Sequence, residues 1–260
     1  QAYRDAKANI VRHQSSEDWA VLNAEQAWVS SMAEDTPSQV RYYSTQPFPT
    51  ENQKGVWLDA EGNISTSHAD RPIAHTSDIA LRGTHNVKNV LAALSVANIL
   101  NIPSDVQVQV LRTFRGLPNR LEVVCTHQDV TYINDTTSTM PEATLAALEV
   151  FSDQVVHLIA GGQSKDVSYQ ELIETIQTSS VRTIILLPGT VSELLQTHLR
   201  LAANQELHTV DDLQTAVTIA QQKANPNDVV LFSPAATSFA SFKNEFDRGE
   251  TFRQAVHTLT

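Results

Sequence analysis

The strongest constraint on the fold is a regular alternation of short apolar runs and amphipathic stretches in the second half of the chain. Helical periodicity predicts helices over 139–150, 168–178, 190–203, 211–224 and 238–257, the last broken near Arg248-Gly249. The apolar runs between them predict buried strands at VVHLIA (155–160), RTIILL (182–187), LHTV (207–210) and DVVLFS (228–233). Such alternation is typical of an α/β fold with a mostly parallel sheet covered on both faces.

Ligands of such sheets bind at the loops that leave the carboxyl ends of the strands. This rule places Asp135, Gly189 and the segments 161–165 and 233–238 on one rim. The loop GGQSK has neither the glycine spacing of a phosphate loop nor the third glycine of a dinucleotide fingerprint. By itself it predicts a tight turn with a solvated lysine, so an anion-binding role for Lys165 needs support from elsewhere.

The first half of the chain has a mixed pattern, and we place a domain boundary where it ends, with domains at 1–117 and 118–260. A helix opens the sequence, and a hairpin (121–135) opens the second domain. Between them the pattern predicts strands at 19–23, 40–45, 55–66 (a hairpin) and 78–83, and helices at 24–33, 84–101 and 105–114.

Composition excludes several classes of protein. The net charge of −11 over 260 residues, without a basic run, argues against nucleic-acid binding. No apolar run approaches the roughly 18 residues of a membrane span. The single cysteine, Cys125, forms no internal disulfide and is expected to be a buried thiol in a reducing compartment, the cytoplasm.

Three polar groupings are candidates for chemistry. Asn86 and Asn89 lie three residues apart near a helix N-terminus, where two carboxamides suit a base or sugar edge, although helix capping explains them equally. Thr139 and Glu142 predict a capping box, which leaves the acid Asp135 unexplained. Ser238 precedes the last helix, where hydroxyl and backbone N–H groups hold a carboxylate or cap the helix; we expect Phe242 and Phe246 to face the core.

Five motifs follow one another along the chain, GTHNVKNVLAAL, FRGLPNRLE, INDTTST, GGQSK and SPAATSFASFKNEFDRGETF. In this order and combination they closely resemble the Mur ligase family over essentially the whole chain. The resemblance implies the later part of a central ATPase α/β domain followed by a Rossmann-like C-terminal domain. It also implies that the chain is a fragment, inactive alone, without the N-terminal domain and the ATP phosphate loop.

The resemblance implies a monomeric, ATP-dependent amide ligase of peptidoglycan synthesis that adds D-glutamate to UDP-N-acetylmuramoyl-L-alanine through an acyl phosphate. Its cofactors would be ATP and Mg²⁺. Lys7 matches the lysine that these ligases carbamylate to help hold a metal ion. Asn86 and Asn89 match contacts to adenine and ribose, Arg120 an arginine near the phosphates, and Asp135 the acid that binds ribose hydroxyls.

The same resemblance implies that Thr139, Lys165, Ser238 and Phe239 receive the incoming D-glutamate, with Lys165 and Lys7 as the catalytic lysines. The chain departs from the family at three positions, where Thr137 replaces a lysine, Asn119 a histidine and Glu245 an aromatic residue. These departures leave two alternatives open: a Mur-type or folylpolyglutamate-type ligase for another amino acid, and a nucleotide-binding module without catalysis.

Overall fold

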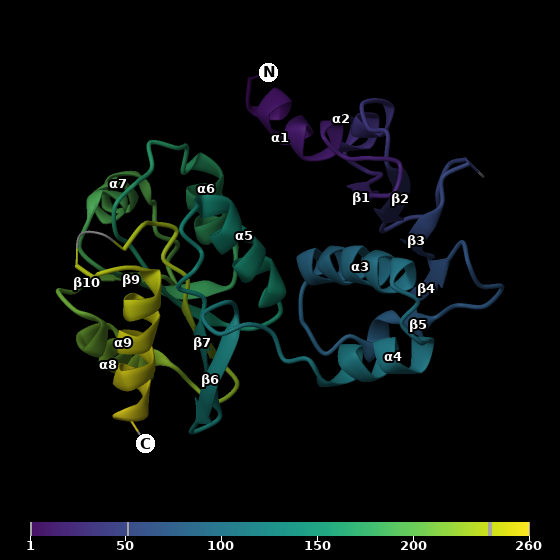
Figure 1. Cartoon of the computed structure of the whole chain (residues 1–260). Coiled ribbons are helices and arrows are strands. Elements are labelled where there is room, and N and C mark those ends of the chain that lie inside the picture. The colour runs from purple at the N-terminus through teal and green to yellow at the C-terminus, as the bar shows by residue number, and fades with distance from the viewer. Residues whose placement is uncertain (1, 51, 239–240, 260) are drawn as a thin grey trace. The chain divides into compact units, whose positions relative to one another are not determined.

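The computed structural model describes residues 2–50, 52–238 and 241–259, and they form two compact units, Gln1–Arg115 and Gly116–Thr260 (Figure 1). Each unit is built around one sheet, and each is described by itself below. Within the described ranges, no helix combines the length and the apolar content that crossing a membrane requires.

The described part of the first unit holds a five-stranded sheet in the order β1-β2-β3-β4-β5. The first three strands are parallel, and β4 and β5 are antiparallel to their neighbours. The strands are β1 (Trp19–Asn23), β2 (Gln39–Ser44), β3 (Gly55–Leu58), β4 (Asn63–Thr66) and β5 (Ala74–His75). The helices are α1 (Ala2–Arg12), α2 (Ala27–Ser30), α3 (Thr84–Ile99) and α4 (Ser104–Thr113), with 3-10 turns at Ser31–Glu34 and Thr76–Asp78.

Apolar packing on this sheet explains the placement of its helices. Leu91 and Leu94 of α3 pack on Val56 and Ile64 of the central strands. The predicted strand at 78–83 is wrong. Asp78 instead accepts a hydrogen bond from the backbone N–H of His75 at 2.9 Å and closes a 3-10 turn, because short acidic side chains compete with a strand ladder for backbone donors.

The second unit has a six-stranded sheet in the order β10-β9-β8-β11-β7-β6 within its described residues. All neighbours are parallel except the hairpin pair β6 and β7. The strands are β6 (Glu122–His127), β7 (Val130–Asn134), β8 (Val156–Ala160), β9 (Val181–Leu186), β10 (Glu206–Thr209) and β11 (Val229–Phe232). The mostly parallel sheet predicted from the apolar runs is confirmed.

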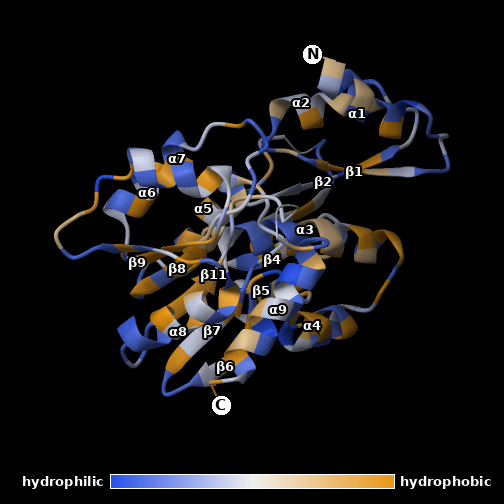
Figure 2. Ribbon diagram, turned by 90° about the vertical axis from the view of Figure 1, so that its left-hand side faces the viewer, coloured by the Kyte–Doolittle hydropathy of each residue, from blue (hydrophilic) through white to orange (hydrophobic). Residues whose placement is uncertain are grey.

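Helices cover both faces of this sheet, so its inner strands are mostly apolar, as the hydropathy colours in Figure 2 show for β8 and β9. The helices α5, α6 and α7 pack on one face, and α8 and α9 pack on the other. Their bounds are α5 (Pro141–Val150), α6 (Gln170–Thr178), α7 (Thr190–His198), α8 (Leu213–Lys223) and α9 (Glu245–His257).

The last helix corrects two expectations. It begins at Glu245, capped by Asn244, and runs unbroken through Arg248 and Gly249, because both residues lie on its buried side. The expectation that both phenylalanines face the core is half wrong. Phe242 packs against the core ahead of the helix, whereas Phe246 is 59% exposed on its outer side.

Three smaller expectations also fail. The capping box predicted for Thr139 and Glu142 does not form: Met140 is the N-cap of α5, and the Thr139 hydroxyl accepts a hydrogen bond from Lys165 instead. The helix predicted to reach residue 203 ends at His198, because the next residue, Leu199, is extended and buried in the core. Cys125 is half-buried rather than buried, and partial burial raises the pKa of its thiol.

Candidate functional site

The candidate site of the second unit lies where the loops after its parallel strands meet. The chain leaves β8 toward α6 on one face of the sheet and leaves the adjacent β11 toward α9 on the other. Two neighbouring strands whose connections diverge in this way leave a crevice between them, which is where open α/β sheets bind ligands.

Backbone pairing holds the loops after β8 and β11 together at this crevice. Gln163 and Thr237 exchange two backbone hydrogen bonds, of 3.3 and 3.0 Å, in an isolated bridge. Gly162 has φ +131°, and a Cβ there would collide with the carbonyl of Thr237, so the close approach requires glycine. The pairing brings Lys165, two residues after Gln163, into the same loop region as Ser238.

Lys165 connects this pair of loops to the loop that follows β7. Its Nζ donates a hydrogen bond to Thr139 Oγ1 at 3.0 Å, and the contact is exposed to solvent. Ser238 is buried in the middle of the loop that connects β11 to α9, and its carbonyl accepts from the N–H groups of Ser241 and Phe242. A cation and two hydroxyl residues therefore come from three loops that the sequence separates widely. Phe239, the fourth predicted contact, lies outside the described residues.

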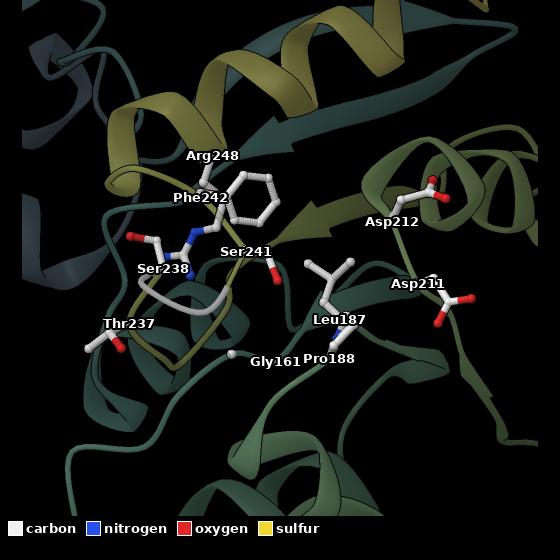
Figure 3. A pocket seen from close by; sticks show the side chains of 11 residues that line it. Gly161, Leu187, Pro188, Asp211, Asp212, Thr237, Ser238, Ser241, Phe242 and Arg248 are labelled. Atoms are coloured by element: carbon white, nitrogen blue, oxygen red, sulfur yellow. The ribbon is translucent and has the colours of Figure 1, made fainter.

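A pocket opens beside these loops on the α8 and α9 side of the sheet (Figure 3). Gly162, Pro188, Ser238 and Arg248 contribute to its wall. Figure 3 shows the Arg248 side chain reaching from α9 toward the loop that carries Ser238.

Asp135 follows β7 and is enclosed by the protein, with 2% of its surface exposed. Its Oδ2 accepts from the hydroxyls of Ser138 and Ser233, and its Oδ1 accepts from the N–H of Leu121 at 3.1 Å. Burial raises the pKa of Asp135, although these three bonds and the nearby charge of Arg120 oppose the shift. Both oxygens thus have partners within the unit, and a contact to ribose hydroxyls stays a prediction.

Arg248 belongs to this site, although its role was missed in the sequence. It is 1% exposed, and its guanidinium donates to the Thr136 hydroxyl at 2.9 Å, the Thr136 carbonyl at 2.7 Å and the Ala236 carbonyl at 3.1 Å. Burial lowers its pKa to about 10, against the opposing charge of Glu245, so the group is protonated at neutral pH. The available signal was its position four residues before Phe252 on the core-facing stripe of the helix.

The segment that carries Arg120 is tied to the same helix. The Oδ1 of Asn119 accepts from Asn134 Nδ2 and from an Arg253 guanidinium nitrogen, each at 3.0 Å. Asn119 has φ +68°, which asparagine tolerates better than most residues. Arg120 itself is exposed, and no described contact tests its predicted role near a phosphate.

The first unit holds the predicted nucleotide contacts. Asn89 Nδ2 donates to Asn86 Oδ1 at 3.3 Å, and Asn86 Nδ2 donates to the Arg82 carbonyl at 2.7 Å. The prediction that the two carboxamides lie together at the start of α3 is confirmed. Carboxamides have the donors and acceptors that a base edge requires, and binding of a nucleotide by Asn86 and Asn89 stays a prediction.

Lys7 lies on the exposed side of α1, with its ammonium 5.5 Å from the centre of the Tyr3 ring. Among the described residues no group of three or more His, Cys, Asp or Glu side chains is placed to hold a metal ion. Binding of Mg²⁺ therefore stays a prediction, with a carbamylated Lys7 as the one residue that the sequence offers for it.

Two family models match the chain. Residues 1–97 match the Mur ligase middle domain, and residues 119–236 match the Mur ligase glutamate ligase domain. Among curated proteins, the UDP-N-acetylmuramoylalanine–D-glutamate ligase of Roseiflexus sp. (strain RS-1) is 37% identical, and the match covers 100% of this chain and 57% of the relative. The enzyme of the same name from Clostridioides difficile (strain 630) is 33% identical over 99% of this chain and 56% of its own length. The chain thus spans little more than half of these relatives.

Solved structures share the fold at low identity. The UDP-N-acetylmuramate–alanine ligase of Thermotoga maritima aligns with a TM-score of 0.69 at 15% identity, over 99% of this chain and 55% of that one. A MurF ligase from the same organism, solved in complex with ADP, aligns with a TM-score of 0.63 at 16% identity, over 98% and 58% of the two chains. These similarities support the arrangement of elements described above.

Proposed function

The chain belongs to the Mur ligase family, and on that premise we propose that the protein is an ATP-dependent ligase that joins D-glutamate to UDP-N-acetylmuramoyl-L-alanine in peptidoglycan synthesis. In this proposal residues 1–117 are the later part of the central ATP-binding domain and residues 118–260 are the amino-acid-binding domain. The reaction would take place in the cytoplasm, where its nucleotide substrates are made and used.

The observation that carries the proposal is the meeting of Lys165, Thr139 and the Ser238 loop at the crevice of the second unit. A dicarboxylate needs a cation for one carboxylate and hydroxyl or N–H donors for the other. Lys165 would bind one carboxylate of D-glutamate together with the Thr139 hydroxyl, and the Ser238 loop would bind the second. Lys165 is therefore an amino-acid anchor rather than a phosphate-loop lysine.

Asn86 and Asn89 in the first unit would bind the base and ribose of ATP through their paired carboxamides. Arg120 would lie near the phosphates, and its charge would favour an anion there. Mg²⁺ supplies charge neutralisation on the phosphates when it is bound. A carbamylated Lys7 would be the residue of the first unit that contacts it.

The chemistry requires little covalent participation by side chains. The terminal carboxylate of UDP-N-acetylmuramoyl-L-alanine attacks the γ-phosphorus of ATP, and ADP leaves. The amine of D-glutamate then attacks the carbonyl carbon of the acyl phosphate, loses a proton, and displaces inorganic phosphate. The protein contributes positioning of the amine and stabilisation of charge, which together account for most of the acceleration in such transfers.

Phosphate release by the protein expressed from its complete gene tests the proposal. With ATP and UDP-N-acetylmuramoyl-L-alanine present, we expect release to depend on D-glutamate and to be absent with L-glutamate. Release that depends on a different amino acid would reassign the ligase to another member of the family. ATP binding without turnover for any amino acid would instead indicate a nucleotide-binding module.

A further inference from the structure

Arg248 is a buried cation whose described hydrogen-bond partners are all uncharged. Its acceptors are the hydroxyl and carbonyl of Thr136, in the loop after β7, and the carbonyl of Ala236, in the loop after β11. The face of the Phe232 ring, 5.9 Å from the guanidinium carbon, lies on a further side. A charge without an anionic hydrogen-bond partner is costly to bury, and burial lowers the pKa of Arg248 although the nearby charge of Glu245 opposes the shift.

A guanidinium at this position holds acceptors on two separate loops in fixed directions, which a compact ammonium does not do. Its Nε and two terminal nitrogens lie in one plane and point in fixed, diverging directions, so one side chain bridges acceptors on two separate loops. Thr136 extends the bridge, because its hydroxyl also donates to the Glu245 carbonyl at 3.1 Å. The loops after β7 and β11 and the first turn of α9 are thereby tied to one planar group.

The loops that Arg248 bridges carry the hydroxyl groups of the candidate site. Thr139 is three residues beyond Thr136. The intervening turn is compact, because the Ser138 N–H donates to the Asp135 carbonyl and the Thr139 N–H donates to the Thr137 carbonyl, each at 2.9 Å. Ser238 is two residues beyond Ala236, next to the Thr237 that pairs with the Lys165 loop. The distance between Thr136 and Ala236 therefore determines the spacing of the groups that bind the amino acid.

We propose that Arg248 is a positioning residue that sets the separation between Thr139 and Ser238, and so the length of the dicarboxylate that the site accepts, without touching that substrate. The proposal rests on the function proposed above. It adds that selectivity for an acid of glutamate's length depends on a buried side chain that bridges the two loops, as well as on the residues that contact the substrate.

The test uses Arg248→Lys in the protein expressed from its complete gene. Lysine keeps the charge but has one nitrogen, which satisfies one loop at a time. We expect KM for D-glutamate to rise about 10- to 100-fold, kcat to change less than about 3-fold, and KM for ATP and UDP-N-acetylmuramoyl-L-alanine to stay constant, because a displacement of about 1 Å costs up to about 100-fold in such sites. The preference for D-glutamate over D-aspartate should fall in parallel.

Phe252→Leu is the matched control. Phe252 is on the same buried face of α9 and stacks on Phe232 at 4.8 Å, so its replacement removes core packing and leaves the bridge intact. It should lower Tm and leave KM for D-glutamate unchanged. If Phe252→Leu raises that KM as much as Arg248→Lys does, or if Arg248→Lys leaves it unchanged, Arg248 is a packing residue and the proposal fails.

A second pair of variants covers the case in which Arg248→Lys does not fold. Thr136→Ser keeps the bridging hydroxyl and should preserve KM for D-glutamate, whereas Thr136→Val removes it and should raise KM in the direction expected for Arg248→Lys. Equal KM values for the two Thr136 variants would contradict the proposal.

Hydrogen exchange separates this inference from the proposed function. Arg248→Lys should reduce the protection of amides in 136–139 and 235–238, and Phe252→Leu should not. If phosphate release by the wild-type protein does not depend on D-glutamate, the proposed function is contradicted. The hydrogen-exchange comparison would still decide whether Arg248 orders both loops. D-glutamate-dependent activity with unchanged protection and KM in Arg248→Lys would overturn the positioning role alone.

Discussion

Lys165 Nζ lies 3.0 Å from Thr139 Oγ1, and this hydrogen bond joins the loops that follow β8 and β7 across the position of β11. The two residues are 26 positions apart in sequence. In the proposed ligase the same ammonium binds a carboxylate of D-glutamate, so the contact holds the anchor in place before the substrate arrives.

Replacing Lys165 by Met should therefore weaken amino-acid binding selectively. A hydrogen bond to a charged group is worth about 1.5 to 3 kcal/mol, so KM for D-glutamate should rise roughly 10- to 100-fold. Steady-state kinetics of the protein from its complete gene measure this. Lys223→Met is the control, because the described contact of Lys223 is an exposed ion pair with Glu206, away from the rim. A KM unchanged by Lys165→Met would remove Lys165 from the amino-acid site.

Asp135→Ala should lower stability even if the residue also contacts ribose. The substitution leaves the Leu121 N–H and the hydroxyls of Ser138 and Ser233 without their acceptor, at a cost of about 1 to 3 kcal/mol for a buried group. Urea denaturation at pH 7 measures the change. Asp212→Ala provides comparison, because it removes an exposed N-cap bond to Thr215 that is worth about 1 kcal/mol. A smaller loss for Asp135 than for Asp212 would contradict the expectation.

Gly249→Ala should destabilise the protein, although alanine is about 1 kcal/mol more favourable than glycine inside a helix. A Cβ at this position would overlap Asn119 Oδ1 and lie 2.6 Å from Thr136 Cγ2. Overpacking of this kind costs about 1 to 3 kcal/mol, so the net change should be a loss seen in the urea midpoint. Gln254→Ala, on the exposed side of the same helix, should be close to neutral. A stabilised Gly249→Ala variant would show that Asn119 moves freely.

His157 should make stability depend on pH. It is buried between strands, and its ring nitrogens contact Thr183 Oγ1 at 2.9 Å and Asp228 Oδ2 at 3.1 Å. Burial lowers its pKa below the ordinary 6.5, aided by Arg182 and opposed by Asp228 and Glu206. The contact with Asp228 is thus, at neutral pH, a hydrogen bond from a neutral ring.

The sign of the effect follows from proton binding. Below pH 6.5 the unfolded chain binds a proton that folded His157 does not, so the stability present above pH 6.5 declines as pH falls toward the lowered pKa. Urea titrations from pH 8 to pH 5 should show this decline in the wild type and in His198→Gln, an exposed histidine. In His157→Gln the decline should be smaller, and an identical slope in the two variants would rule out the mechanism.

The sequence alone determined the architecture of the second unit, because strand-length apolar runs between amphipathic helices have few ways to bury their surface. It also determined that Asn86 and Asn89 share one side of a helix end, since a spacing of three residues is a local property. The structure of the segment 78–83 and the N-terminus of α5 were harder to predict from the sequence. The predicted strand at 78–83 and the capping box at Thr139 were lost to competing hydrogen bonds that the sequence does not rank.

Only the tertiary structure decided which side chains surround the candidate site. The sequence placed Asp135 on the rim, but its enclosure by Ser138 and Ser233 depends on the neighbouring positions of β7 and β11, which are 98 residues apart at that contact. Arg248 was not predicted as a site residue, because helical periodicity marks it only as one more inward position and does not name its partners. Its acceptors come from two distant loops, and such contacts arise only when the sheet order brings those loops together.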